Sequence, residues 1–160
     1  VDSDGNLFYS TSEGIFPVQG VEPTIPYKKN ITPFALAYHE SSDMLYFLDI
    51  DVKQGNYAVS SCESENCAPT LTQVSSFSVP SVGKFELNGW MVIDSTGENL
   101  YWAASSLIGD IYKVQLSNGS NSLLFSSKER INGISLAGDD NSIFVSDGTM
   151  VNQYDITDSP

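Results

Sequence analysis

One short pattern occurs four times along this sequence. An acidic turn rich in Ser, Gly and Asn is followed each time by three apolar or aromatic residues that predict a β-strand. The triplets are Leu7–Tyr9, Leu45–Phe47, Leu100–Trp102 and Ile143–Val145. Successive triplets start 38, 55 and 43 residues apart. The chain is therefore built from four repeats, and each repeat has room for several short strands.

The repeat is clearest over residues 89–116. An apolar strand over 90–93, a polar turn over 94–98 and an aromatic strand over 99–105 precede a turn at Gly109-Asp110 and a last strand over 111–116. Such runs predict an antiparallel meander. A period of this size, with several strands per repeat, is typical of β-propeller blades. The sequence thus predicts an all-β chain, a β-propeller of about four antiparallel blade units.

We expect a single domain over residues 1–160, with repeats at about 1–30, 31–80, 81–128 and 129–160. Two of the four predicted blades are complete and two are partial, because the first lacks its innermost strand and the last its outermost. An insertion around 62–81 explains the longest interval. An unclosed row of blades leaves a strand edge and an apolar face at each end. More of the chain, its other end or a neighbouring subunit must cover them.

Composition limits the partners. The chain is 41% hydrophobic, which is enough for a real core, but it carries a net charge of −13. An acidic surface repels phosphate groups, so we expect neither nucleic-acid binding nor docking on anionic membranes. No apolar run approaches the ~20 residues of a membrane-spanning helix.

Cys62 and Cys67 are separated by four residues. In an oxidising compartment they would form a disulfide, with two free thiols as the alternative. A zinc site is not expected, because the one histidine, His39, is distant in sequence. Asn30 and Asn118 each begin an Asn-X-Ser/Thr sequon, which predicts N-linked glycans. Together these features predict an extracellular, secreted glycoprotein.

The segments Leu45–Asp49, Leu100–Ala104 and Ile143–Asp147 resemble the Tyr-Trp-Thr-Asp repeat of low-density lipoprotein receptor type propellers, which are related to NHL-type propellers. The resemblance implies a six-bladed, extracellular ring that binds proteins. It also implies that the acid of the repeat, matched by Asp49 and Asp147, joins neighbouring blades through hydrogen bonds. Ala104 replaces this acid in the third repeat.

Four aromatic residues of these strands are predicted to pack between blades: Tyr46, Phe47, Tyr101 and Trp102. Phe144 is expected in the core with them, because both faces of an inner blade strand are buried. A carbohydrate-stacking surface is the alternative interpretation. Trp90 and Phe77 are less constrained and are candidates for an interface.

An enzymatic role is not expected. With His39 as the one histidine, a Ser-His-Asp triad has no support. Propellers similar to regucalcin-type lactonases hold a central divalent ion with acidic residues and Asn, and Glu40, Asp94 and Asp139 could form such a ring. These residues are also ordinary turn residues. The segment 49–55 resembles the start of a calcium loop but lacks a third ligand and the terminal Glu. We expect no cofactor.

The leading functional hypothesis is a non-enzymatic structural module that self-associates through incomplete blade edges, forming a ring or a filament. The first alternative is a ligand-binding propeller fragment of a receptor or matrix protein, whose acidic surface recruits a basic partner. The second alternative is a metal-dependent hydrolase of regucalcin-like type.

Overall fold

The computed structural model describes residues 7–11, 14–18, 25–26, 33–51, 56–64, 67–78, 89–104 and 109–157. Within these ranges the chain forms fourteen β-strands, one short 3-10 helix and one α-helix, α1 (Cys67–Thr70). No helix in the same ranges is long and apolar enough to cross a bilayer. The all-β prediction is confirmed.

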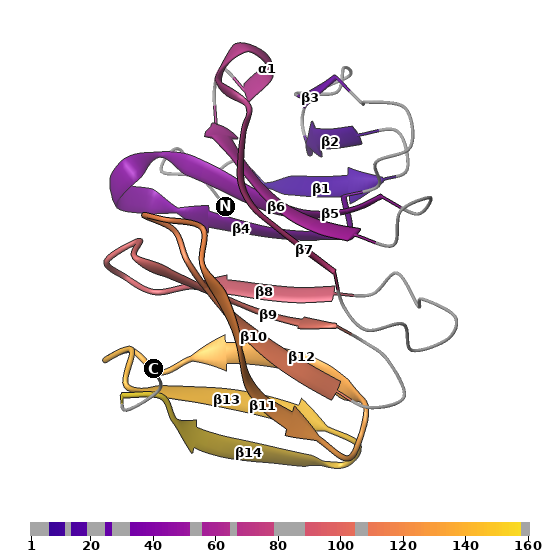
Figure 1. Cartoon of the computed structure of the whole chain (residues 1–160), viewed down its shortest axis with the longest axis vertical. Coiled ribbons are helices and arrows are strands. Elements are labelled where there is room, and N and C mark those ends of the chain that lie inside the picture. Colours follow the sequence, from indigo (N-terminus) through magenta and orange to yellow (C-terminus); the bar gives the residue numbers. More distant parts are fainter. Residues whose placement is uncertain are drawn as a thin grey trace. The chain divides into compact units, whose positions relative to one another are not determined.

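The chain divides into two compact units, Val1–Ser81 and Val82–Pro160, and each is described by itself. In the N-terminal unit, the first sheet holds β1 (Phe8–Thr11), β2 (Gly14–Pro17) and β3 (Ile25–Pro26). The second sheet holds β4 (Ala35–His39), β5 (Met44–Asp51), β6 (Asn56–Glu63) and β7 (Thr72–Ser78). The 3-10 helix η1 (Glu40–Ser42) joins β4 to β5, and α1 lies between β6 and β7 (Figure 1).

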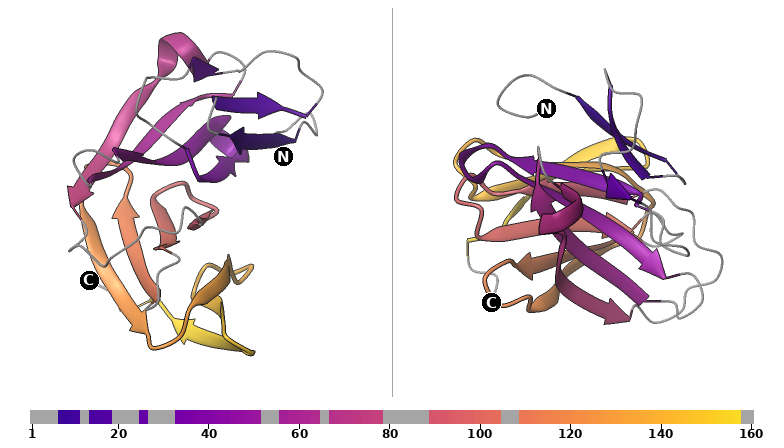
Figure 2. Two further views of the ribbon diagram at one scale, coloured as in Figure 1. Left: turned by 90° about the vertical axis from the view of Figure 1, so that its right-hand side faces the viewer. Right: turned by 90° about the horizontal axis from the view of Figure 1, so that it is seen from above.

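In the C-terminal unit, the third sheet holds β8 (Gly89–Ile93), β9 (Asn99–Ala104), β10 (Gly109–Gln115) and β11 (Asn121–Ser127). The fourth sheet holds β12 (Ile131–Leu136), β13 (Ser142–Asp147) and β14 (Met150–Asp155). In all four sheets the strands are antiparallel, and their order in space follows the sequence (Figures 1 and 2).

The four sheets differ in strand number as the sequence predicts: two have four strands and two have three among the described residues. The repeated triplets lie in or at the start of β1, β5, β9 and β13. In the other three sheets the triplet lies in the second strand, which is β5, β9 or β13, whereas in the first sheet it belongs to the first strand, β1. The first sheet therefore lacks a counterpart of β4, β8 and β12 in the described ranges. The fourth sheet lacks there a counterpart of β7 and β11.

The turns between first and second strands share one backbone feature. Each contains a residue in the left-handed region: Asp43 at φ 52°, Gly97 at φ 70° and Asp140 at φ 57°. Glycine adopts this conformation without steric cost, and aspartate is one of the few other residues that does so readily. The acidic and glycine content of the repeated turns therefore has a direct structural reason.

Apolar residues from neighbouring sheets form one core in each unit. In the N-terminal unit, Ile15 of β2 packs with Leu45 and Phe47 of β5, together with Cys62 and Cys67. The core of the C-terminal unit combines residues of the third and fourth sheets, with one more after β14: Tyr101, Ala103, Ile111, Ile131, Ile143, Val145 and Ile156. Both cores thus join the faces of two adjacent sheets.

The turn predicted at Gly109-Asp110 is wrong. Both residues belong to β10, where Gly109 pairs with Ser127 and Asp110 with Ala104. A side chain at position 109 would collide with the side chain of Ile131 and lie 3.0 Å from the Glu129 carbonyl oxygen. Glycine is needed at this position for close packing between the third and fourth sheets, rather than for a turn.

Replacing Gly109 by Ala should lower the free energy of unfolding by about 1–3 kcal/mol, because the added methyl group would overlap the fully buried side chain of Ile131. Urea unfolding measures the change. Gly138→Ala is the matched control, since a methyl group at that position meets nothing within 4 Å. Equal stability of the two variants would contradict the packing role of Gly109.

Candidate functional site

The carboxylate of Asp94 organises the turn between β8 and β9. Its Oδ1 accepts hydrogen bonds from the Glu98 backbone N–H at 2.9 Å and from Thr96 Oγ1 at 3.0 Å. Its Oδ2 accepts from the backbone N–H of Asn99 at 3.1 Å and from Asn99 Nδ2 at 2.8 Å. Asp94 is also buried. Both oxygens of this carboxylate therefore accept two hydrogen bonds each from residues of the same turn and of the start of β9.

The other two residues of the predicted acidic ring lie in separate turns. Glu40 is exposed in η1, and Asp139 is exposed between β12 and β13. The oxygens of Asp139 accept from the backbone N–H and the side-chain amide of Asn141, and these bonds lower the pKa of Asp139. Within the described ranges, no group of three or more His, Cys, Asp or Glu residues is placed to hold a metal ion.

His39 ends β4 and is buried. Its Nδ1 lies 2.7 Å from Ser42 Oγ, and its Nε2 lies 3.2 Å from Ser41 Oγ. Both ring nitrogens therefore contact hydroxyl groups of the turn that follows the strand. These contacts fix the ring against η1, which is a sufficient structural role for this residue.

Asp147 connects the two sheets of the C-terminal unit. Its Oδ2 accepts a hydrogen bond from Ser127 Oγ at 2.9 Å, and its Oδ1 accepts from Asn152 Nδ2 at 2.9 Å. Ser127 ends β11 in the third sheet, whereas Asp147 ends β13 in the fourth. Both side chains are buried, so the bond between them contributes more than an exposed one would.

Asp49 occupies the corresponding position of β5 but has different surroundings. It is 5% exposed, and its Oδ1 has no hydrogen-bond partner among the residues that the structure describes. Burial raises the pKa of this carboxyl group from 3.8 to about 7. Asp49 is thus a buried acid that is partly neutral near physiological pH.

The four predicted core aromatics are all buried: Tyr46, Phe47, Tyr101 and Trp102. Trp102 stacks on Tyr112 with ring centroids 4.7 Å apart. Burial, and secondarily the carboxylates of Asp94 and Asp140, raise the pKa of Tyr101 to about 12. The expectation for Phe144 is wrong, because it is 37% exposed. Its strand β13 buries only the opposite face, which carries Ile143 and Val145.

The structure contains a disulfide between Cys62 of β6 and Cys67 of α1. Both cysteines belong to the core of the N-terminal unit.

Asn118 is exposed in the turn between β10 and β11, so its sequon is accessible. Asn30, most of the segment 49–55 and the side chain of Phe77 lie outside what the structure describes. Trp90 is partly exposed, and its Nε1 donates to the Ile131 carbonyl at 3.4 Å.

The fourth sheet ends at β14, beyond which no strand is paired in the described ranges (Figure 1). Met150 and Val151 on this strand are 63% and 69% exposed. The face of this sheet opposite the core is mostly polar, and the pairing of the strands places these residues on it: Ser135, Ser142, Phe144, Ser146, Val151, Gln153 and Asp155. Among the described residues, this sheet therefore lacks the apolar end face expected from the sequence, and no strand pairs with the second edge of β14.

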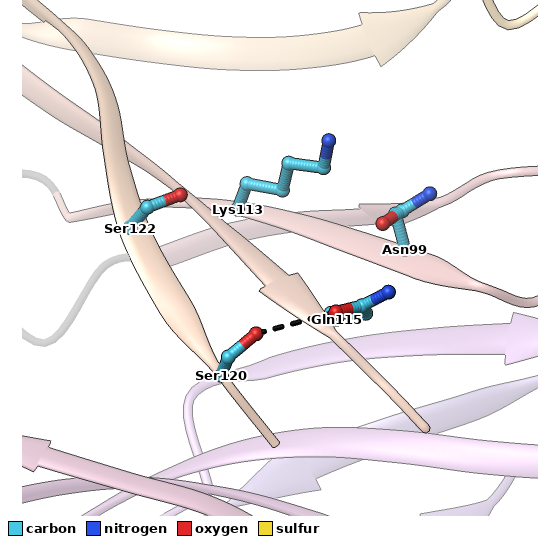
Figure 3. Close-up of a pocket in the computed structure, with 5 residues that line it drawn as sticks. All are labelled: Asn99, Lys113, Gln115, Ser120 and Ser122. Carbon is cyan, nitrogen blue, oxygen red and sulfur yellow. Dashed lines mark hydrogen bonds between the residues drawn. The ribbon is translucent and has the colours of Figure 1, made fainter. Parts of the chain in front are cut away.

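A polar hollow of about 150 Å³ lies on one face of the third sheet, near the turn between β10 and β11 (Figure 3). It is lined by Asn99, Lys113, Gln115, Ser120 and Ser122. Further along the same face, Tyr101 and Ile111 enter the core. Sequence analysis missed this hollow. Its signal is the change from apolar to polar residues on one face of β9 and β10.

No protein-family model and no curated protein matches the chain. Among solved structures, an oligogalacturonate lyase from Vibrio parahaemolyticus aligns with 98% of this chain and 47% of its own, at a TM-score of 0.68 and 8% identity. TolB from Acinetobacter baumannii aligns with 91% of this chain and 35% of its own, at a TM-score of 0.62 and 13% identity. A nidogen/laminin complex aligns with 94% of this chain and 73% of its own, at a TM-score of 0.49 and 10% identity.

The lyase and TolB structures are β-propellers, and the likeness shows that this chain has the β-propeller fold. Identities this low show the fold alone. The chain also spans less than half the length of either protein.

Asp49→Asn tests the buried acid. The folded state holds the Asp49 proton more tightly than the unfolded state does, so wild-type stability should fall as pH rises from about 4 to about 7. The variant avoids this loss and should exceed the wild type by up to roughly 4 kcal/mol at about pH 8, with little gain at about pH 4. Urea unfolding across this range measures the difference.

Asp155→Asn is the control for this experiment. The pKa of the exposed Asp155 is lowered by hydrogen bonds from Thr157, so the group is ionised across most of the same range. A pH-independent difference between Asp49→Asn and the wild type would show that Asp49 is not perturbed by burial.

Ser127→Ala tests the link between the third and fourth sheets. Removing the hydroxyl leaves Asp147 Oδ2 without its buried donor and should destabilise the protein by about 1–3 kcal/mol. The neighbouring Ser126 bonds to Asp110 Oδ1 at 2.6 Å on the exposed side, so Ser126→Ala should cost about 1 kcal/mol or less. Thermal unfolding of both variants provides the comparison. A larger loss of stability in Ser126→Ala than in Ser127→Ala would contradict the stabilising role of the bond between Ser127 and Asp147.

Proposed function

We propose that this chain is a non-enzymatic, extracellular module that self-associates through the open edge of β14. The observation that carries the proposal is that the fourth sheet has three strands in the described ranges, whereas the second and third have four. Its last strand exposes Met150 and Val151. An open strand edge with exposed apolar residues is a template for pairing with another chain.

The sequence of β14 suits pairing with a second copy of itself. Natural edge strands are commonly protected by Lys, Pro or a bulge, and β14 contains no Lys or Pro and pairs with β13 without a break in register. In an antiparallel pair centred on Asn152, Met150 of each copy lies opposite Tyr154 of the other. A thioether beside an aromatic ring is a favourable contact. No two carboxylates are opposed in this register.

The extracellular location is supported by the disulfide between Cys62 and Cys67, since such bonds persist in oxidising compartments. The accessible sequon at Asn118 fits the same location and N-linked glycosylation. Assignment of the repeats to the Tyr-Trp-Thr-Asp type is supported by the bond from Ser127 to Asp147, because the acid of that repeat joins neighbouring blades.

A non-enzymatic role is supported by the use made of the acidic turns. Asp94 accepts four hydrogen bonds within its own turn, and Asp139 is bonded to Asn141. A catalytic base or metal ligand needs at least one oxygen directed to a substrate or an ion.

Receptor-type binding of a basic protein is the second candidate, and the net charge of −13 favours it.

Sedimentation velocity separates self-association from binding of a basic partner. Copies of an acidic chain repel each other, so self-association should strengthen as the salt concentration rises from about 0.05 M to about 0.5 M. Val151→Lys should keep the protein monomeric, because it places a charged side chain on the edge strand β14. This is expected even though the substitution reduces the net negative charge and hence the repulsion between copies.

Val18→Lys is the matched control, because Val18 is also exposed, at 55%, and does not belong to β14. This variant should associate like the wild type. A wild-type chain that remains monomeric at every salt and protein concentration would rule out self-association. Capture of a basic protein that weakens with salt would then favour the receptor-type role.

A further inference from the structure

We propose that the polar hollow on the third sheet holds the first sugar of a glycan on Asn118. The inference rests on the extracellular location proposed above and concerns a different surface from β14. It follows from the position of the Asn118 side chain, the chemistry of the hollow and its size.

The atom that would carry the glycan is hydrogen-bonded to a residue that lines the hollow. Asn118 Nδ2 donates to Gln115 Oε1 at 2.8 Å, and Gln115 lines the hollow. Asn118 Oδ1 accepts from the Ser120 backbone N–H at 2.8 Å, and Ser120 Oγ lies 3.4 Å from Gln115 Oε1. These bonds hold the Asn118 amide against Gln115 and Ser120, two residues that line the hollow in Figure 3, while Asn118 stays exposed in the turn.

Glycosylation is compatible with this arrangement. A glycosyl diphosphate donor supplies the sugar: the bond from Nδ2 to the anomeric carbon forms and the bond from that carbon to the donor phosphate oxygen breaks. The diphosphate leaves with the electron pair, and one Nδ2 proton passes to the base of the transferring enzyme. Nδ2 keeps its second hydrogen, which can still bond to Gln115 Oε1.

The lining provides the groups that a sugar requires. Asn99 gives one Nδ2 hydrogen to Asp94 and offers its second Nδ2 hydrogen and its Oδ1. Lys113 provides an ammonium group and Ser122 a hydroxyl group. Lys113 and Asn99 are half-buried, so contacts to them are partly shielded from water. Hydroxyl and acetamido groups on a sugar ring match this set of donors and acceptors.

The size of the hollow favours a tethered sugar over a free ligand. Sites for free small molecules usually measure ≈ 300–1,000 Å³. This hollow is about 150 Å³ and is open on one side. A weak site gains occupancy when its ligand is covalently attached nearby, because the local concentration is then high.

The test uses two preparations of the same chain. One is secreted by eukaryotic cells and trimmed enzymatically to a single N-acetylglucosamine at each occupied site; the other is made in bacteria, with its disulfide verified by mass. Both carry Asn30→Gln, so only the Asn118 sequon remains. We expect intact mass to show one sugar on the secreted form, and its melting temperature to be about 2–4 °C higher.

Lys113→Met should remove most of this shift, because it keeps the apolar stem and loses the ammonium donor. Lys128→Met is the matched control, since Lys128 is exposed and does not line the hollow. Gln115→Ala, on an exposed residue of the same wall, is the second variant if Lys113→Met does not fold. Its glycan-dependent shift should also be reduced.

Two results would overturn the inference: an unoccupied Asn118 in secreted protein, or an equal glycan-dependent shift in wild type and both hollow variants. Neither result depends on β14. A chain that carries the stabilising sugar but stays monomeric would disprove the self-association and leave this inference in place.

Discussion

Burial of apolar sheet faces against one another is the interaction on which each compact unit depends. Ile111 of β10, Ile131 of β12 and Ile143 of β13 are fully buried in one core, although they belong to two sheets. An isolated sheet of three or four strands leaves such a face in water, so neither sheet of the C-terminal unit is complete without the other. The strands, turns and polar links derive their positions from this contact.

Polar groups are found where these packed faces end. Asp94 fixes a turn, and Asp147 joins two sheets through Ser127 and also bonds to Asn152. Asp49 is equally buried but has one oxygen without a partner among the described residues, and its pKa is raised. Asp49 and Asp147 occupy equivalent positions of the repeat, but among the described residues only Asp147 has hydrogen-bond partners for both of its carboxylate oxygens.

The fourth sheet differs in character between its outer face and its edge strand. Its outer face is mostly serine and other polar residues, as in the capping repeats of repeat proteins. Its edge strand β14 has no such protection and exposes Val151. For this reason the assembly that we propose adds a strand at this edge rather than stacking on this face.

The sequence by itself determined the order of most strands and which sheets have four of them, because alternation and turn chemistry are local properties of Leu45–Asp51 or Asp94–Leu100. It did not predict β3 (Ile25–Pro26), a strand of two residues in a segment that contains proline. It also placed Trp102 and Tyr46 in a core. Only the tertiary structure decided that Gly109 is a close-packing residue, that Phe144 is exposed and that Lys113 lines a polar hollow. The physical reason is that pairing fixes which residues share a face, whereas packing between sheets decides which face is covered.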